Sequence, residues 1–212
     1  MKYRDQIILF ATGALFSQIV LDTLIDKKIK PAAVVLPVYA PASIENLPGI
    51  RIEPNTYPGE FVIQVLDSSI PVIYAPEKCQ HKLPLQLSEI QVDYILVACW
   101  PYLIGRDTTG LAGKAALNIH PSLLPKYRGA NPIYDQFADG KVELGVTLHL
   151  MNQAFDQGDI LSQLKLGFPS DYSEMKELEV KSARVGAGLF IDAMKSYANP
   201  GWTAVKQPDL VC

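Results

Sequence analysis

Apolar and polar residues follow one another in short runs that predict strands separated by helices. Residues 6–11, 32–36 and 72–74 are apolar runs of strand length, whereas residues 16–27 and 60–67 repeat apolar positions at helical spacing. A strand–helix–strand order predicts a parallel sheet, because the helix returns the chain to the edge where the first strand began. The first half of the chain therefore has the pattern of an α/β protein.

The second half of the chain extends the same pattern. Residues 94–98 are apolar throughout, which is typical of a strand buried on both faces. Further elements are expected as a helix at 84–89, a loop at 99–103, strands at 115–120, 145–151 and 160–166, a helix at 131–137 and a terminal helix at 173–197. Ser173 is its expected N-cap, and Asn199-Pro200-Gly201 is expected to stop it. Residues 37–58 contain five prolines and are interpreted as an irregular excursion. We predict one domain, 1–212, with a three-layer α/β/α sandwich and a mostly parallel, Rossmann-like sheet.

Composition narrows the class of protein. The 212 residues are 49% hydrophobic and 19% charged, as in a soluble globular protein, and the net charge of −3 argues against a nucleic-acid surface. We find no apolar run of membrane-spanning length and no signal-peptide pattern. Cys79, Cys99 and Cys212 lack Cys-x-x-Cys spacing, which indicates reduced thiols and a cytoplasmic location. Three histidines without a cluster make a zinc site unexpected.

The candidate chemistry begins at the end of one predicted strand. Side chains two apart on a strand share a face, so Asn118 and His120 are expected to point the same way, and Pro121 ends the ladder after them. An amide donor beside a titratable ring, at the carboxyl end of a strand, can stabilise an oxyanion and move a proton. For an isolated Asn-x-His, the alternative is a capped strand with a satisfied histidine.

Two long motifs resemble the folate-dependent formyltransferases. Residues 118–127, Asn-Ile-His-Pro-Ser-Leu-Leu-Pro-Lys-Tyr, are similar to the active-site segment of glycinamide ribonucleotide formyltransferase. Residues 128–133 are more similar to the continuation in methionyl-tRNA and sugar-nucleotide formyltransferases. Residues 145–149 and then 155–161 resemble the second conserved block of the family. The resemblance spans roughly residues 94–166, with both motifs in the family's order.

This resemblance implies transfer of a formyl group from N10 of 10-formyltetrahydrofolate to an amine, without a metal. The family's catalytic residues fall on Asn118, His120 and Asp156. Asn118 would donate to the oxygen of a tetrahedral intermediate, His120 would be a second donor, and Asp156 would orient His120 and accept the amine proton. A carboxylate nearby would raise the pKa of His120 and favour the imidazolium form near neutrality. The family also commonly places a cis peptide at the position of Leu124-Pro125.

The resemblance also implies where the ligands bind. The family's pterin slot falls on the loop after the strand at 94–98, and the candidate cofactor-binding residues are Trp100, Tyr102, Leu103, Ile104 and Leu117. Packing of the two aromatic side chains beneath the loop is an equally open interpretation. The candidate substrate-binding residues are Arg128, Gly129 and His149. Arg128 contacts an anionic acceptor or is a solvated loop arginine, and His149 is expected to support the site more than to act directly.

Three departures from the family concern the acceptor. The turn at residues 11–17 lacks the glycine- and asparagine-rich phosphate loop of the purine-pathway enzyme. The chain stops soon after the expected terminal helix, so we expect no C-terminal tRNA-binding domain and no initiator tRNA as substrate. Residues 37–58 do not match the corresponding loops of the family, and such loops often carry specificity.

The leading hypothesis is a formyltransferase that uses 10-formyltetrahydrofolate and a small-molecule amine, with an amino sugar nucleotide as the acceptor class to test first. One alternative is a formyltetrahydrofolate hydrolase (deformylase), in which water takes the place of the amine. A second is a non-catalytic folate-binding protein, which would have no need for all three polar residues together. A generic nucleotide-binding domain is least favoured, because no phosphate-cradling glycine loop is visible. Neither a nucleic acid nor a membrane is expected as partner, and the sequence leaves the oligomeric state open.

Overall fold

The computed structural model describes residues 5–38, 59–139, 144–167, 175–197, 199 and 202–208. The elements in chain order are β1 (Ile7–Ala11), α1 (Leu15–Asp26), β2 (Ala33–Val38), α2 (Gly59–Asp67), β3 (Val72–Pro76), the 3-10 helix η1 (Glu77–Lys82), α3 (Leu83–Leu87), β4 (Tyr94–Ala98), α4 (Arg106–Thr109), β5 (Ala115–His120), α5 (Pro132–Ala138), β6 (Leu144–Leu150), β7 (Ile160–Leu166) and α6 (Met175–Ser196). Three predicted features lie wholly or partly outside the described residues: the Ser173 cap, Pro200-Gly201 of the helix stop, and residues 39–58 of the proline-rich excursion.

The strands form one sheet in the order β3-β2-β1-β4-β5-β6-β7. The first five strands in sequence are parallel to one another, and β6 and β7 reverse the direction in turn. The chain winds outward from β1 to β3 and then returns to place β4 on the other side of β1. Such a reversal of winding opens a crevice at the carboxyl ends of the central strands, where α/β proteins bind ligands.

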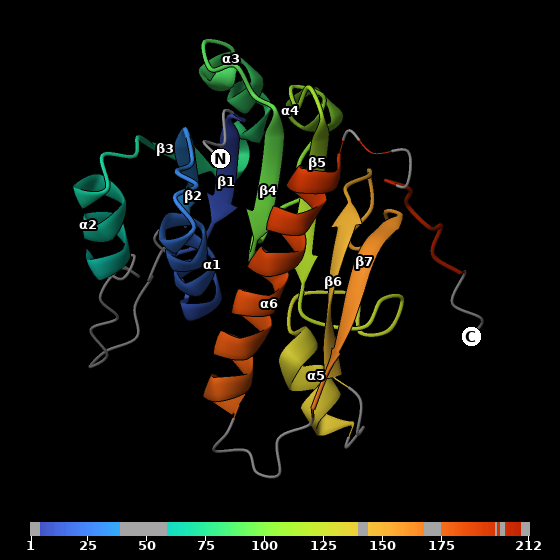
Figure 1. Ribbon diagram of the computed structural model, residues 1–212. Coiled ribbons are helices and arrows are strands. Elements are labelled where there is room, and N and C mark those ends of the chain that lie inside the picture. The colour runs from blue at the N-terminus through green and yellow to red at the C-terminus, as the bar shows by residue number, and fades with distance from the viewer. Residues whose placement is uncertain are drawn as a thin grey trace, which may run out of the picture.

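Apolar side chains fill both faces of the sheet. On one face, residues of α1, α2 and α6 such as Val20, Phe61 and Phe190 pack against the strands, and all three are fully buried. On the other face, Leu83 and Leu87 of α3 cover Phe10 and its neighbours. In Figure 1, α1 and α6 cross the front of the sheet, with α3 and α4 gathered at its upper end. This arrangement confirms the predicted three-layer α/β sandwich with a mostly parallel sheet.

Several element boundaries differ from the predictions. Strand β2 continues through Pro37 to Val38, although a proline was expected to end it. Its pairing with β1 stops at Val35, whereas its pairing with β3 runs to Val38, so Pro37 has a strand on one side only and its missing N–H is tolerated. The helix predicted at 84–89 is η1 followed by α3, and α4 had no counterpart in the prediction. Among the helices described, none is both long and apolar enough to cross a lipid bilayer.

Candidate active site

The site is built on the last parallel strand and its antiparallel neighbour. Leu117 and Ile119 of β5 belong to the core that faces α6, so the alternation of the strand turns Asn118 and His120 to the opposite face. Strand β6 runs antiparallel beside β5 and pairs His149 with Asn118. The predicted shared face of Asn118 and His120 is confirmed, and β6 adds a second imidazole to it.

Asp156 reaches this pair from the turn between β6 and β7. Its backbone has a φ of 54°, in the left-handed region that few residues other than glycine adopt without cost. Two residues later, a Cβ on Gly158 would collide with the carbonyl oxygen of Leu150. The turn therefore passes so close to the end of β6 that only glycine fits at position 158, and this closeness brings the Asp156 carboxylate over the strand.

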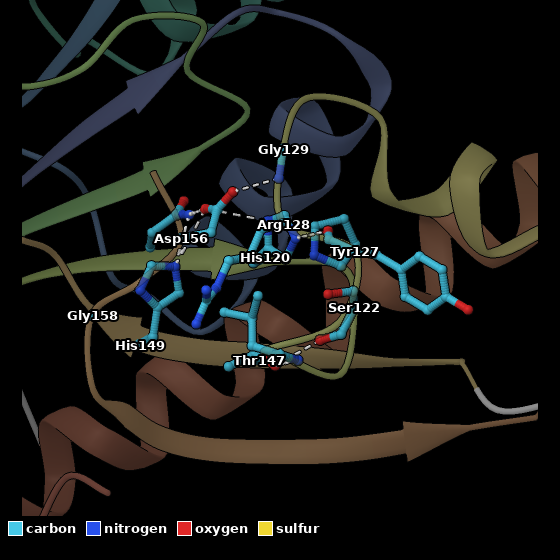
Figure 2. Close-up of polar contacts among 12 residues, drawn as sticks. His120, Ser122, Tyr127, Arg128, Gly129, Thr147, His149, Asp156 and Gly158 are labelled. Carbon is cyan, nitrogen blue, oxygen red and sulfur yellow. Dashed lines mark hydrogen bonds and ion pairs between the residues drawn. The ribbon is translucent and has the colours of Figure 1, made fainter. Parts of the chain in front are cut away.

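The three candidate catalytic side chains and His149 form one contact network (Figure 2). Asn118 Nδ2 lies 3.1 Å from Asp156 Oδ1 and 3.1 Å from His149 Nε2. The same carboxylate oxygen lies 3.4 Å from His120 Nδ1 and 3.6 Å from His149 Nε2. The other oxygen, Oδ2, accepts the backbone N–H of Gly129 at 2.9 Å. The structure thus joins Asn118, His120 and Asp156 with the predicted residues Gly129 and His149.

The loop after β5 holds the far side of the His120 ring. Tyr127, in a left-handed conformation with a φ of 57°, turns its carbonyl oxygen toward His120 Nε2 at 2.7 Å. A carbonyl oxygen only accepts hydrogen bonds, so Nε2 carries a proton and the free nitrogen of the neutral ring is Nδ1, which faces Asp156. Leu124-Pro125 in this loop is a cis peptide, as the family resemblance predicted.

A buried threonine fixes the base of this loop to the sheet. Thr147 Oγ1, on β6, donates to the carbonyl oxygen of Ser122 at 2.6 Å and accepts the backbone N–H of Leu124 at 3.2 Å. Gln163 Nε2, on β7, donates to Thr147 Oγ1 and to the Leu124 carbonyl oxygen, both at 2.8 Å. Two strands therefore set the start of the loop that carries Tyr127 and Gly129.

Burial and charge act in opposite directions on the protonation of this network. Burial lowers the pKa of His120 below its ordinary value, and this effect outweighs Asp156 and the Tyr127 carbonyl, which both raise it. The expectation that the nearby carboxylate raises the pKa of His120 above normal is therefore wrong, because the ring is almost completely removed from water. Burial also raises the pKa of Asp156, but contacts with His149, His120 and the Gly129 N–H outweigh it and hold that pKa below normal. At neutral pH the site contains a carboxylate beside a neutral imidazole.

A cavity of about 430 Å³ opens beside these residues. Asn118, His120 and Asp156 form part of one wall, and Trp100, Tyr102, Leu103 and Ile104 form part of another. Trp100 also packs edge-on against Phe10 at 5.0 Å, so it both supports the loop and lines the cavity. Leu117 lies in the core on the α6 side and is not among the residues that line this cavity.

The comparisons with known proteins decide the family. Residues 5–194 match the Formyl transferase family. The chain belongs to this family. Methionyl-tRNA formyltransferase of Listeria monocytogenes serotype 4a (strain HCC23) is 32% identical over 143 residues, which cover 67% of this chain and 45% of that relative. The chain spans less than half the length of this curated relative, and the family predicted from the two motifs is confirmed.

Solved structures of other formyltransferases share the fold. Glycinamide ribonucleotide transformylase 1 from Symbiobacterium toebii has a TM-score of 0.72 at 18% identity, covering 96% of this chain and 94% of the other. WlaRD, a sugar 3N-formyl transferase solved in the presence of dTDP and 5-N-formyl-THF, has a TM-score of 0.61 at 19% identity, covering 98% and 68%. At such identities these structures support the formyltransferase fold alone.

Arg128, Gln207 and Phe155 differ in how far the sequence predicted their positions. Arg128 does not line the cavity; its Nε and Nη2 atoms donate to Gln207 Oε1 at 3.2 and 2.7 Å. A role for Arg128 in substrate binding stays a prediction. Gln207 was not predicted, because it lies in an irregular segment without a motif, 51 residues after the turn that it contacts. Phe155 also lines the cavity and is half exposed. The feature of the sequence that could have pointed to it is its position next to Asp156.

Proposed function

We propose that this protein transfers a formyl group from 10-formyltetrahydrofolate to the amino group of a small molecule. One observation carries the proposal: Asp156 contacts both Asn118 and His120 on the wall of a cavity at the carboxyl edge of the sheet. A satisfied core histidine would not need a carboxylate, an amide and an open cavity on the same side. The family match supports the same type of chemistry.

The cavity suits the ring system of a folate. Its volume falls within the range of ~300–1,000 Å³ that small-molecule sites occupy. Leu103 and Ile104 provide apolar surface, and Trp100 Nε1 is a buried donor with no partner among the residues that the structure describes. A buried donor of this kind is costly unless a ligand or water accepts its hydrogen bond. The walls therefore fit the proposed donor substrate, and among the described residues no group of three or more histidine, cysteine or acidic side chains could hold a metal ion.

The protonation states fit the direction of proton flow. The acceptor nitrogen forms a bond to the formyl carbon, and the carbonyl π pair moves to the oxygen. His120 Nδ1, unprotonated at rest, can take the proton that the amine loses, and Asp156 at 3.4 Å stabilises the imidazolium that results. When the bond from the formyl carbon to N10 breaks, that nitrogen needs a proton, and the same imidazolium can return it. The burial that lowers the pKa of His120 thus keeps it ready to act first as a base.

Asn118 is the proposed donor to the oxyanion, but its amide is already engaged. Its Nδ2 donates to Asp156 Oδ1 and lies 3.1 Å from His149 Nε2, while His149 Nδ1 lies 2.8 Å from the Leu150 carbonyl oxygen. The formyl oxygen has to displace one of the two contacts of Asn118 Nδ2 to receive a hydrogen bond from it. One such donor typically lowers the barrier by ~3–4 kcal/mol.

For the acceptor, we propose an amino sugar nucleotide as the first class to test. Support comes from the segment that begins Arg128-Gly129 and from the block that ends at His149, which resemble the sugar-nucleotide branch of the family. Gly129 lies on the cavity wall, so this segment can contact an acceptor bound there. The structural relative WlaRD is named as a sugar 3N-formyl transferase, which is consistent with this class.

The test follows the appearance of tetrahydrofolate. Purified protein would be incubated with 10-formyltetrahydrofolate alone and then with a panel of amines that includes amino sugar nucleotides. Release that requires one amine, together with a formylated product, would support the proposal and identify the acceptor. Release at the same rate without any amine would favour a hydrolase. Folate binding without release under every condition would leave a binding protein, and His120→Ala serves as the inactive control.

A further inference from the structure

The segment that follows α6 returns to the edge of the sheet beside the site. Val205 pairs with Ile160 at the start of β7 through two backbone hydrogen bonds of 2.8 Å. Earlier in the segment, Trp202 Nε1 donates to the carbonyl oxygen of Ala193 on α6 at 3.2 Å. These contacts hold the segment in place and bury Gln207, which is 5% exposed, beneath the turn that carries Asp156.

Both the nitrogen and the oxygen of the Gln207 side-chain amide form hydrogen bonds. Its Nε2 donates to the backbone carbonyl oxygens of Asp156 at 2.9 Å and Gly158 at 2.6 Å. Its Oε1 accepts the Nε and Nη2 groups of Arg128. A buried amide with every group paired favours one arrangement, because the loss of one partner leaves a buried polar atom unsatisfied.

Arg128 lies between the two backbone groups that hold the candidate catalytic side chains. The residue before it, Tyr127, turns its carbonyl oxygen to His120, and the residue after it, Gly129, donates its N–H to Asp156. Figure 2 shows these three residues in sequence along the loop that passes over the site. Gln207 therefore connects the His120 loop, through Arg128, to the backbone of the Asp156 turn.

The backbone of Asp156 has a reason to need such support. A residue other than glycine in a left-handed conformation is strained and persists only where neighbouring contacts hold it. Asn118 and Gly129 donate hydrogen bonds to the side-chain carboxylate of Asp156. Gln207 instead holds the backbone, through the carbonyl oxygens of Asp156 and Gly158. Without those two bonds the turn can relax, and the carboxylate then moves away from His120.

We propose that Gln207 is a positioning residue for formyl transfer, which sets the distance between Asp156 and His120 by bonding the Asp156 turn and Arg128 at once. The inference rests on the proposed function for its kinetic consequence, although the geometry that it describes is independent of any substrate. Gln207 is not among the residues that line the cavity, so its loss should lower kcat and leave folate binding largely unchanged.

Three variants separate the two ends of the Gln207 amide. Gln207→Glu keeps an acceptor for Arg128 but replaces the donor to the two carbonyl oxygens with a group that repels them. Gln207→Ala removes both ends, and Arg128→Ala removes the partner on the loop. Lys206→Ala changes an exposed neighbour in the same segment and is the matched control. If Gln207→Ala does not fold, Gln207→Glu and Arg128→Ala provide the same comparison.

The readouts are kcat, KM for 10-formyltetrahydrofolate, the melting temperature, and the titration of the His120 ring followed by NMR. For both Gln207 variants we expect kcat to fall by about tenfold to a hundredfold at temperatures well below melting, with KM within about threefold of wild type. The His120 titration should move to lower pH, because Asp156 is what opposes the effect of burial on that ring. Arg128→Ala should also lower kcat and move the His120 titration to lower pH, and Lys206→Ala should match wild type.

A lower melting temperature with wild-type kcat and an unchanged His120 titration would overturn the proposal and leave Gln207 as a stabilising contact. A raised KM for the acceptor in Arg128→Ala, with kcat unchanged, would likewise contradict the coupling and assign Arg128 to substrate binding. If wild-type protein transfers no formyl group to any acceptor, the proposed function fails. The NMR titration still decides the role of Gln207 in that case, because it needs no substrate.

Discussion

At the scale of single residues, the site depends on a neutral histidine that is kept next to a charged carboxylate. His120 is 4% exposed, and its Nδ1 faces an oxygen of Asp156 at 3.4 Å. Burial opposes the positive charge while the carboxylate favours it, and burial has the larger effect. In the proposed reaction, the proton that leaves the acceptor amine would meet a base whose counter-charge is already in place.

Replacing His120 tests this role directly. His120→Ala should lower kcat by at least about a hundredfold, because general acid–base catalysis of this kind contributes ~10²–10⁴. The affinity for folate should stay within about tenfold, or roughly 1.4 kcal/mol, since the apolar walls of the cavity remain. Steady-state kinetics and calorimetric titration with folate would measure the two quantities. Normal turnover in this variant would remove His120 from the mechanism.

Asp156→Asn changes the charge and retains the shape. The asparagine oxygen can still accept the Gly129 N–H, but its NH2 group then faces Asn118 Nδ2 in place of the acceptor Oδ1, and the negative charge beside His120 is lost. We expect kcat to fall by at least about a hundredfold and the pKa of His120 to fall further, because Asp156 raises it in the native protein. The measurement is kcat together with the NMR titration of the ring. Retained activity would reduce Asp156 to a residue that only shapes the turn.

At the scale of elements, the packing of α6 on β5 controls the strand that carries the site. Gly186 of α6 lies against Ile119, the residue between Asn118 and His120, and a Cβ at position 186 would collide with the Ile119 Cγ2 methyl group. Gly188, two residues further along the same helix, has no atom within 4 Å of the position of its missing Cβ. The two glycines thus offer a matched pair of substitutions.

Gly188→Ala should stabilise the protein by up to about 1 kcal/mol, because alanine is the better helix former and meets no neighbour. Gly186→Ala should destabilise it by about 1–3 kcal/mol despite the same gain in propensity, because the core around Ile119 is overpacked. Gly186→Ala should also lower kcat, since Ile119 cannot shift without moving its neighbours. Denaturant unfolding and kinetics would measure both effects. Equal stability of the two variants would contradict the close packing of α6 against β5.

Elements and motifs differed in how far the sequence determined them. The parallel sheet followed from the alternation of apolar runs, and the contact of Asp156 with His120 followed from two motifs that resemble a known family. Two results did not follow. The lowered pKa of His120 depends on how completely the ring is buried, which requires the packed structure. The contact of Gln207 with Asp156 depends on the path of a segment that has no periodicity to reveal it.

At the scale of the whole molecule, the buried titratable groups give folding a dependence on pH. His120 has a lowered pKa when folded, so the unfolded chain binds more protons below the ordinary value of 6.5. Its contribution to stability is complete above pH 6.5 and is lost as pH falls toward the folded pKa. Asp156, also lowered, acts in the same sense below its ordinary value of 3.8. Glu179 on α6 acts in the opposite sense, since burial raises its pKa above the ordinary 4.5 and its contribution is lost as pH rises.

The contribution of His120 can be isolated by comparing two proteins. His120→Gln removes the titrating ring, while Glu179 and Asp156 are retained in both proteins. Between about pH 7.5 and about pH 5, a range that spans the ordinary histidine pKa of about 6.5, the unfolding free energy of wild type should fall by more than that of His120→Gln. Denaturant unfolding at several pH values would measure the difference. Parallel curves for the two proteins would show that His120 titrates alike in the folded and unfolded chain.

The position of α6 at the end of the sequence has a consequence for synthesis on the ribosome. All seven strands precede α6, yet Ile119, Val146 and Leu148 of the sheet are buried in the core that this helix completes. A nascent chain emerges from its amino end at ~5–20 residues per second, so the strands leave the ribosome before the helix that covers them. During that interval the sheet can present an apolar face to solvent, which makes the unfinished chain a natural client for chaperones that bind exposed apolar surface.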